Sequence, residues 1–191
     1  MNARLKQALF AAACIAQLAL PLSLVAQHEQ TRASGTPWKF QTAPVDPGDP
    51  FRGRYVRLSY KVERDPVPLT DATHYYVPAG TRMYAELLAG PDGYATLVKL
   101  HPQRPESGEY IDVFVRYMRQ PAKDGGKQPP AAIVHVPFDR YYLPEEKAGE
   151  VERRYGEASR KAMANTYAEV RVRAGHAALV SLVLDGKPVT P

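Results

Sequence analysis

The sequence predicts a mainly β (α+β) fold: a single antiparallel β-sandwich or barrel-like domain with one short helix, preceded by an N-terminal transmembrane or signal helix. Three observations predict it. The 191 residues include 18 Pro and 13 Gly, more than a helical bundle tolerates, because Pro lacks an amide donor and Gly loosens the backbone. Several segments alternate apolar and polar residues, as half-buried strands do. One long apolar run stands near the start, and the remaining length suits one domain.

The leader, residues 1–26, contains an apolar segment over residues 8–26 that has only two distinctly polar side chains. A helix of about 20 residues spans the hydrocarbon core of a bilayer. Arg4 and Lys6 precede the segment and Glu29 follows it, so the positive-inside rule leaves the amino terminus in the cytoplasm. We therefore expect residues 8–26 to have the lipid bilayer as their partner. The chain would then be a single-pass protein of the cell membrane, with its domain on the extracytoplasmic, periplasmic side.

A cleaved signal peptide is the alternative, which would release the domain as a secreted protein. Ala26 suits the position before a cut, but Leu24 is a poor partner for a small-x-small cleavage site. The long apolar run and this weak site favour the uncleaved anchor. A lipid anchor on Cys14 is less favoured, because the apolar run continues well beyond that cysteine.

The part of the chain beyond the leader has little net charge and no cysteine. It carries 23 basic against 20 acidic side chains once the two basic residues of the leader are set aside. No basic stripe with interleaved aromatic residues is present, so we expect no nucleic-acid partner. Without cysteine there is no disulfide and no cysteine-based metal site. The five histidines lie far apart, and we expect no metal and no cofactor.

Residues 27–36 are polar and small, which indicates a linker, and residues 37–191 are expected to form the β-rich domain. The clearest strand is 54–62, where Val56, Leu58, Tyr60 and Val62 share one face. Other strands are expected near Trp38 and Phe40 and at 74–77, 82–89, 94–100, 110–117 and 132–138.

Turn chemistry and helix signals complete the outline. Gly90-Pro91-Asp92-Gly93 is typical of a hairpin turn, and residues 120–130 read as an exposed loop. A helix is expected over 145–154, because Pro144 precedes two acids that suit a helix amino end. The segments 166–173 and 177–184 are expected to form a closing hairpin.

Two blocks of sequence resemble the family named for its motif GDYXXLXY. In the first, Gly53, Tyr55, Leu58 and Tyr60 match the motif, and Arg54 occupies the position of its acid. The second block runs from Tyr141-Tyr142-Leu143-Pro144-Glu145 to Glu152. The resemblance extends from the leader to Leu184-Asp185-Gly186-Lys187-Pro188 and so covers nearly the whole chain.

The resemblance implies a membrane-anchored extracytoplasmic bacterial protein without an assigned activity, often accompanied by a multi-spanning membrane protein. It transfers no catalytic residue. The replacement of the acid by Arg54 argues that the motif is structural: Gly53 supplies a turn or bulge, while Tyr55 and Tyr60 fall on opposite faces of the strand.

A functional alternative is that Asp46, Asp49 and Arg52 meet the second block across the sheet in a charged pocket. Arg52 would then pair with Glu145 or Glu152, because guanidinium and carboxylate bind bidentately; a purely structural ion pair is the simpler interpretation. His135 is the one histidine of interest, within a predicted strand. The candidate binding residues are Asp46, Asp49, Arg52, Gly53, Tyr55, Leu58, Tyr60, Tyr142, Pro144, Glu145 and Glu152.

Three functions follow as hypotheses. The sequence contains no nucleophile motif or phosphate loop, which favours a noncatalytic interaction module for a membrane or envelope partner. The alternatives are a carboxylate-dependent envelope hydrolase and a small-ligand binding protein with a barrel-like cavity. An enzyme is the less favoured class, and no catalytic residue is assigned.

Overall fold

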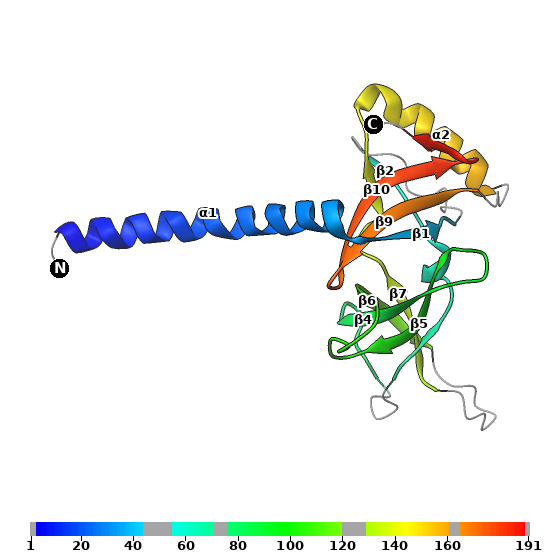
Figure 1. Cartoon of the computed structure of the whole chain (residues 1–191), viewed down its shortest axis with the longest axis horizontal. Helices are drawn as coiled ribbons and strands as arrows, with labels where there is room; N and C mark the ends of the chain where they lie inside the picture. Colours follow the sequence, from blue (N-terminus) through cyan, green and yellow to red (C-terminus); the bar gives the residue numbers. More distant parts are fainter. Residues whose placement is uncertain (1–2, 44–54, 71–75, 120–128, 161–164, 190–191) are drawn as a thin grey trace.

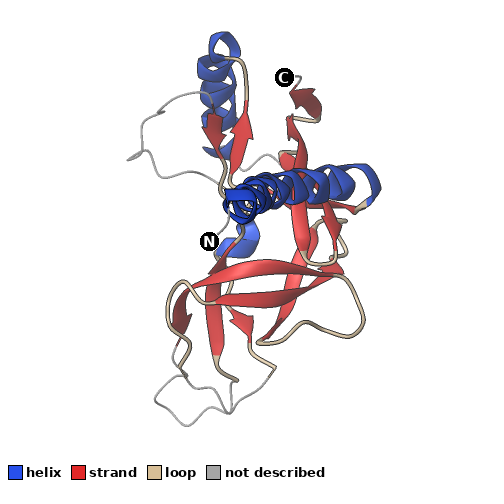
Figure 2. Ribbon diagram, turned by 90° about the vertical axis from the view of Figure 1, so that its left-hand side faces the viewer, coloured by secondary structure: helices blue, strands red, loops and turns tan. Residues whose placement is uncertain are grey.

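The computed structural model has the predicted mainly β fold, with antiparallel sheets, one of them curled into a nearly closed, barrel-like form (Figures 1 and 2). It describes residues 3–43, 55–70, 76–119, 129–160 and 165–189. The helices are α1 (Ala3–Ser34), the 3-10 turn η1 (Lys61–Glu63) and α2 (Glu145–Arg160). The strands are β1 (Thr36–Gln41), β2 (Tyr55–Arg57), β3 (Val67–Pro68), β4 (Arg82–Ala89), β5 (Ala95–His101), β6 (Tyr110–Arg119), β7 (Ala131–His135), β8 (Arg140–Tyr142), β9 (Tyr167–Arg173), β10 (His176–Leu184) and β11 (Lys187–Val189).

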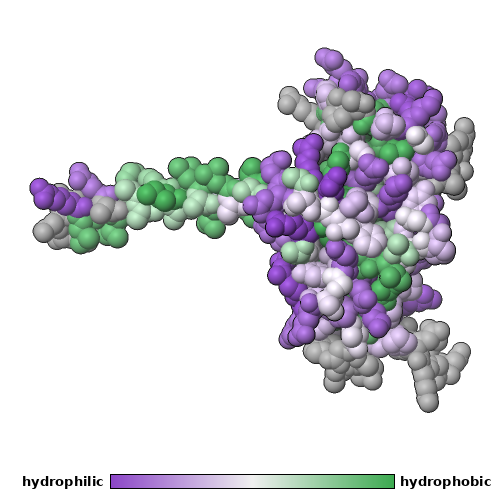
Figure 3. All heavy atoms as spheres, in the orientation of Figure 1, coloured by the Kyte–Doolittle hydropathy of each residue, from purple (hydrophilic) through white to green (hydrophobic). Residues whose placement is uncertain are grey.

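Helix α1 projects from the β-rich part of the chain and leaves its apolar side chains uncovered (Figures 1 and 3). Phe10 is 72% exposed and Leu20 is 70% exposed. The helix is long and apolar enough to cross a membrane, by length and composition. Water disfavours apolar surface that the protein itself does not cover.

The residues expected as a linker continue α1 through Ser34. Thr31 is buried against the sheets, and the Arg173 guanidinium donates a hydrogen bond to the Gln30 side chain at 2.8 Å. Gly35 ends the helix, with its amide donating to the Thr31 carbonyl at 2.9 Å. A Cβ at Gly35 would lie 2.5 Å from that carbonyl oxygen. The chain therefore passes from α1 into β1 with no flexible segment between them.

Two larger sheets make up most of the fold. One has the order β1-β9-β10-β11 and the other the order β3-β7-β6-β4-β5, and a short ribbon pairs β2 with β8. In Figure 1 the second of these sheets lies below the first, and α2 lies at the top. All strand pairs within the sheets are antiparallel. The predicted hairpins are confirmed: β4 and β5 are joined at Gly90–Gly93, and β9 and β10 are joined at Ala174–Gly175.

The turn between β9 and β10 connects the two larger sheets. Its Gly175 carbonyl accepts a hydrogen bond from the Asp112 amide of β6 at 2.9 Å. Gly175 has a φ of 87°, and a Cβ there would lie 2.8 Å from Asp112 Oδ1 and from the Tyr110 ring. Only glycine fits both the backbone conformation and this close approach.

The core centres on three aromatic rings. Phe40 of β1 lies with its ring centroid 4.9 Å from that of Phe138, and Tyr60 lies 5.2 Å from Phe138. All three are buried. Helix α2 adds one apolar face at helical spacing, comprising Ala148, Val151, Tyr155 and Ala158.

The expected strand over 54–62 is wrong in its length. Among the described residues of this segment, only Tyr55–Arg57 forms a strand, and η1 begins at Lys61. The predicted alternation nevertheless holds, because Val56, Leu58, Tyr60 and Val62 are all buried. The chain turns here, and the Glu63 carboxylate accepts a hydrogen bond from the Tyr60 amide at 3.3 Å across the turn.

Other boundaries also differ from expectation. The strand expected over 132–138 ends at His135, a short strand β8 follows, and α2 continues to Arg160 rather than 154. Residues 76–77 are not strand. Residues 74–75 and 120–128 lie outside the described residues, so the strand expected at 74–77 is contradicted only in its described half.

Tyr155 provides a test of how α2 is held. Its hydroxyl donates to the Ala43 carbonyl at 3.1 Å and accepts from the Ser59 amide at 3.1 Å. We expect Tyr155→Phe to lower the free energy of unfolding by about 1–3 kcal/mol, because one buried and one partly buried backbone group lose a partner. Chemical denaturation of the full chain in detergent measures this loss. The control Tyr117→Phe, at a residue 59% exposed, should change stability by less than about 0.5 kcal/mol, and equal losses in both variants would contradict the assignment.

Candidate functional site

The two sequence blocks that resemble the family motif meet in the structure as the β2–β8 ribbon, here called the motif ribbon. Val56 pairs with Tyr141, and both are buried. The Tyr141 hydroxyl donates to the Val189 carbonyl of β11 at 2.9 Å, which ties the ribbon to the four-stranded sheet. Burial raises the pKa of Tyr141. The inner face of the ribbon is therefore part of the core.

The outer face of the motif ribbon presents aromatic and basic side chains. Tyr55 pairs with Tyr142, and their ring centroids lie 5.8 Å apart. The Arg140 guanidinium lies 5.2 Å from the centre of the Tyr55 ring, within the range of a cation–π contact. The pKa of Arg140 is raised, mainly by a hydrogen bond to the Tyr142 side chain and to a lesser extent by the charges of neighbouring groups. Tyr142 is 63% exposed, so this cluster faces the surroundings of the protein.

A buried carboxylate lies beneath the ribbon. Glu63 Oε1 accepts hydrogen bonds from the Val136 amide at 3.0 Å and from His135 Nδ1 at 2.7 Å, and Oε2 accepts from the Tyr60 amide. Burial acts to raise the pKa of Glu63, but the hydrogen bonds from His135, Val136 and Tyr60 outweigh it and lower that pKa. The carboxylate is held as an anion, and all three donors come from the protein itself.

A series of polar contacts leads from Glu63 to the outer face. His135 Nε2 lies 4.0 Å from Asp139 Oδ2, and Asp139 lies 3.5 Å from the Arg57 guanidinium of β2. Arg140 of β8 also lies 3.9 Å from Asp139. The Leu58 amide donates to the Asp139 carbonyl at 2.7 Å. These contacts fix the two strands of the ribbon relative to the sheet that contains β7.

The other predicted motif residues have structural positions where they are described. Leu58 is buried in the core, and the buried Tyr60 hydroxyl donates to the Phe138 carbonyl at 2.9 Å. The Pro144 carbonyl accepts the first hydrogen bonds of α2, from Lys147 and Ala148. Tyr60 is fully buried, whereas Tyr55 is half-buried and lies against Tyr142. Tyr60 lies beyond the end of β2, so the two tyrosines do not share one strand as expected.

Of the residues expected to form a charged pocket, the structure describes only the two glutamates. Glu145 is exposed and Glu152 is half-buried, both on α2. Asp46, Asp49, Arg52, Gly53 and Arg54 lie outside the described residues, so the pairing of Arg52 with either glutamate stays a prediction. Within the described residues, no group of three or more His, Cys, Asp or Glu side chains is arranged to hold a metal ion.

Sequence reasoning singled out Tyr60 and His135 but missed Glu63, which accepts hydrogen bonds from both. One signal was available: Glu63 stands three residues after the last motif tyrosine, the spacing at which a glutamate can accept a hydrogen bond from a backbone amide at the start of a helical turn. Asp139 and Arg140 had no such signal, because β8 is too short for an alternating pattern.

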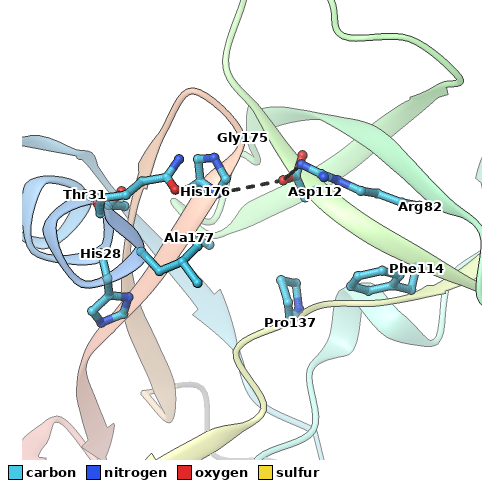
Figure 4. Close-up of a pocket in the computed structure, with 11 residues that line it drawn as sticks. His28, Thr31, Arg82, Asp112, Phe114, Pro137, Gly175, His176 and Ala177 are labelled. Atoms are coloured by element: carbon cyan, nitrogen blue, oxygen red, sulfur yellow. Dashed lines mark hydrogen bonds and ion pairs between the residues drawn. The ribbon is translucent and has the colours of Figure 1, made fainter. Parts of the chain in front are cut away.

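A second candidate site lies where α1 joins the sheets, here called the helix-junction cavity (Figure 4). It has a volume of about 350 Å³, within the range of small-ligand sites. One face of α1 borders it, through Leu24, Gln27, His28 and Thr31. The opposite walls come from Arg82, Asp112, Phe114, Pro137, Gly175, His176 and Ala177.

The helix-junction cavity contains an ion pair. The Arg82 guanidinium of β4 donates to Asp112 Oδ2 of β6 at 2.5 Å, and His176 Nδ1 lies 4.0 Å from the same oxygen. The Asp112 side chain is 11% exposed, whereas the Arg82 side chain is 49% exposed. The other oxygen, Asp112 Oδ1, is buried and has no hydrogen-bond partner among the described residues.

Comparison with known proteins gives one match. A family model described as GDYXXLXY protein matches residues 17–182, from within α1 to within β10. It thus includes both the motif ribbon and the helix-junction cavity. No curated protein and no solved structure matches the chain.

Glu63 predicts a specific pH dependence of stability. A carboxyl whose pKa is lowered in the folded state stabilises the protein fully above its unfolded pKa of about 4.3, and this stabilisation is lost as the pH falls through the folded pKa. We expect Glu63→Gln to lower the free energy of unfolding at pH 7 and to flatten its decline below about pH 4. Denaturation between pH 3 and pH 7 measures both effects. As a control, Glu157→Gln at an exposed position of α2 should leave the acid slope unchanged, and a parent-like slope in Glu63→Gln would contradict the role of this carboxylate.

Proposed function

The chain belongs to the GDYXXLXY protein family, and on that premise we propose that it is a membrane-anchored extracytoplasmic interaction module without catalytic activity. Its motif ribbon docks on a partner in the membrane or envelope. The observation that carries the proposal is the convergence of the two motif blocks into one ribbon with an exposed tyrosine and arginine cluster.

The properties of α1 support anchoring. The helix has 32 residues, about 48 Å at 1.5 Å per residue, which exceeds the thickness of roughly 30 Å of a bilayer core. Residues 8–26 cross the hydrocarbon, and the last turns remain outside, where they pack on the sheets through Thr31. Arg4 and Lys6 favour the cytoplasm for the amino terminus. The β-rich part then lies in the periplasm.

The chemistry of the motif ribbon supports docking. Tyrosine and arginine are enriched among residues that dominate binding energy at protein interfaces. Here Tyr55, Tyr142 and Arg140 contact one another, and the buried Glu63 and the Asp139 pairs hold the backbone below them. A preorganised cluster loses less conformational entropy on binding. A partner with aromatic and acidic side chains suits this surface, and a multi-spanning membrane protein is the proposed class.

The ribbon is tested by capture from membranes under gentle detergent. We expect Tyr142→Ala to reduce the captured partner at least about tenfold, because truncation of a central interface tyrosine costs more than about 1.4 kcal/mol. Tyr117→Ala is the matched control, since Tyr117 is also borne by a strand and is 59% exposed, against 63% for Tyr142. The partner is the protein that the parent and Tyr117→Ala retain and Tyr142→Ala loses. Capture that is equal in all three excludes docking through the ribbon.

Anchoring is tested separately by mass and topology. We expect the intact mass of the membrane-bound chain to include residues 1–26, and we expect replacement of both Arg4 and Lys6 by Glu to disturb the orientation of the domain. A mature amino terminus at Gln27 would overturn the anchor and leave export intact. Protease accessibility in spheroplasts reports the orientation, with a cytoplasmic protein as the control for lysis.

A further inference from the structure

The helix-junction cavity lies at the level where the apolar part of α1 ends. Leu24 belongs to the apolar segment, whereas Gln27 and His28 belong to the polar turns that follow, and all three border the cavity. With α1 in a bilayer, this boundary coincides with the headgroup layer. The cavity therefore opens at the depth at which phospholipid phosphates and their substituents lie.

The walls of the cavity carry opposite charges side by side. Arg82 contributes a guanidinium whose side chain is 49% exposed, and one of its five donors is used by Asp112. Asp112 contributes a carboxylate whose Oδ2 accepts from Arg82, while its Oδ1 is buried against Gly175 without a partner among the described residues. A donor in the cavity therefore approaches the Oδ2 side of the carboxylate, which is 11% exposed as a side chain. Such a carboxylate gains more from a new donor than a solvated one does, because burial has already removed its water.

We propose that the helix-junction cavity binds the headgroup of an aminophospholipid, with the phosphate on Arg82 and the primary ammonium on Asp112. A mixed-charge wall matches a zwitterion, whereas a purely anionic headgroup would face the Asp112 carboxylate. Leu24 lines the cavity, and the acyl chains of the lipid would extend past it along the apolar surface of α1. The inference rests on the proposed membrane anchoring and is independent of docking through the motif ribbon.

Gly175 belongs to the same site. It holds Asp112 by the backbone hydrogen bond from the Asp112 amide, and its lack of a side chain leaves room for Asp112 Oδ1 at a distance where a Cβ would clash. His176, the next residue, lines the cavity and adds a ring nitrogen 4.0 Å from Asp112. Figure 4 shows His176 and Arg82 approaching Asp112 from different elements, with His28 across on α1.

The test uses the full chain in detergent and measures retained lipid by native mass spectrometry. The probes are phosphatidylethanolamine and phosphatidylcholine with the same acyl chains. Both have one phosphate and one positive charge, but the trimethylated ammonium has no N–H to donate. We expect the parent protein to prefer phosphatidylethanolamine about tenfold, the effect of one charge-assisted hydrogen bond.

Three variants separate the two charges. Asp112→Asn keeps the shape of the side chain and should abolish the preference for phosphatidylethanolamine, so that the two lipids are retained about equally. Arg82→Gln should weaken both lipids, because both present the phosphate. Arg153→Gln removes a guanidinium from an exposed position on α2 and should leave the binding of both lipids unchanged. Should Asp112→Asn fail to fold, the half-exposed Arg82 still tests the phosphate contact.

Several outcomes would overturn the proposal. Equal retention of the two lipids by the parent removes the ammonium contact, and tighter binding of phosphatidylglycerol indicates an anionic headgroup instead. Free O-phosphoethanolamine that competes at the affinity of the lipid identifies a soluble ligand rather than a membrane one. The anchoring is checked first, by membrane extraction, before any lipid is measured. A chain that is absent from the membrane fraction refutes the anchoring.

Discussion

The buried carboxylate of Glu63 is the constraint on which the arrangement of the motif residues depends. It accepts hydrogen bonds from the backbone at Tyr60 and Val136 and from the His135 ring, so it joins the end of the first motif block to the end of β7. Breaking such a set is strongly destabilising, because it leaves a buried charge without compensation. The chain that follows β2 therefore turns at Tyr60, and β8 pairs with β2.

This constraint explains why the motif tyrosines have different roles. Tyr60 is drawn into the core, where its hydroxyl satisfies the Phe138 carbonyl, whereas Tyr55 stays on the outer face against Tyr142. A surface cluster built on short strands would be mobile without support from below. The contacts of Asp139 with Arg57 and His135 link that surface to the core. Individually these ion pairs contribute little stability because they are partly exposed. Together they help to orient the motif ribbon, which the Tyr141 hydrogen bond already attaches to β11.

Much of the fold was predictable because it is encoded locally. The alternation of Val56, Leu58, Tyr60 and Val62 gave the buried face even though the strand ends early, and the glycine turns gave both hairpins. The candidate sites were not predictable in the same way. Arg82 and Asp112 lie on the paired strands β4 and β6, and only the packing of the β9–β10 turn on β6 adds His176 to them. No spacing in the sequence reports such a contact. The length of α1 was also missed, because the polar residues after Ala26 suit an exposed helix as well as a linker.

If α1 crosses a bilayer as proposed, its continuity with β1 would hold the two candidate sites in a fixed position relative to that bilayer. A flexible linker would let the β-rich part tumble, and the position of the motif ribbon relative to the membrane would then be undefined. Here Gln30 and Gly35 fix the helix end to β9 by hydrogen bonds from Arg173 and Arg171, and the helix-junction cavity forms where α1 meets the sheets. A headgroup bound by Arg82 and Asp112 would contact α1 and both larger sheets at once. It would therefore stabilise the orientation in which the ribbon is presented, and lipid composition would influence docking without any change in the ribbon itself.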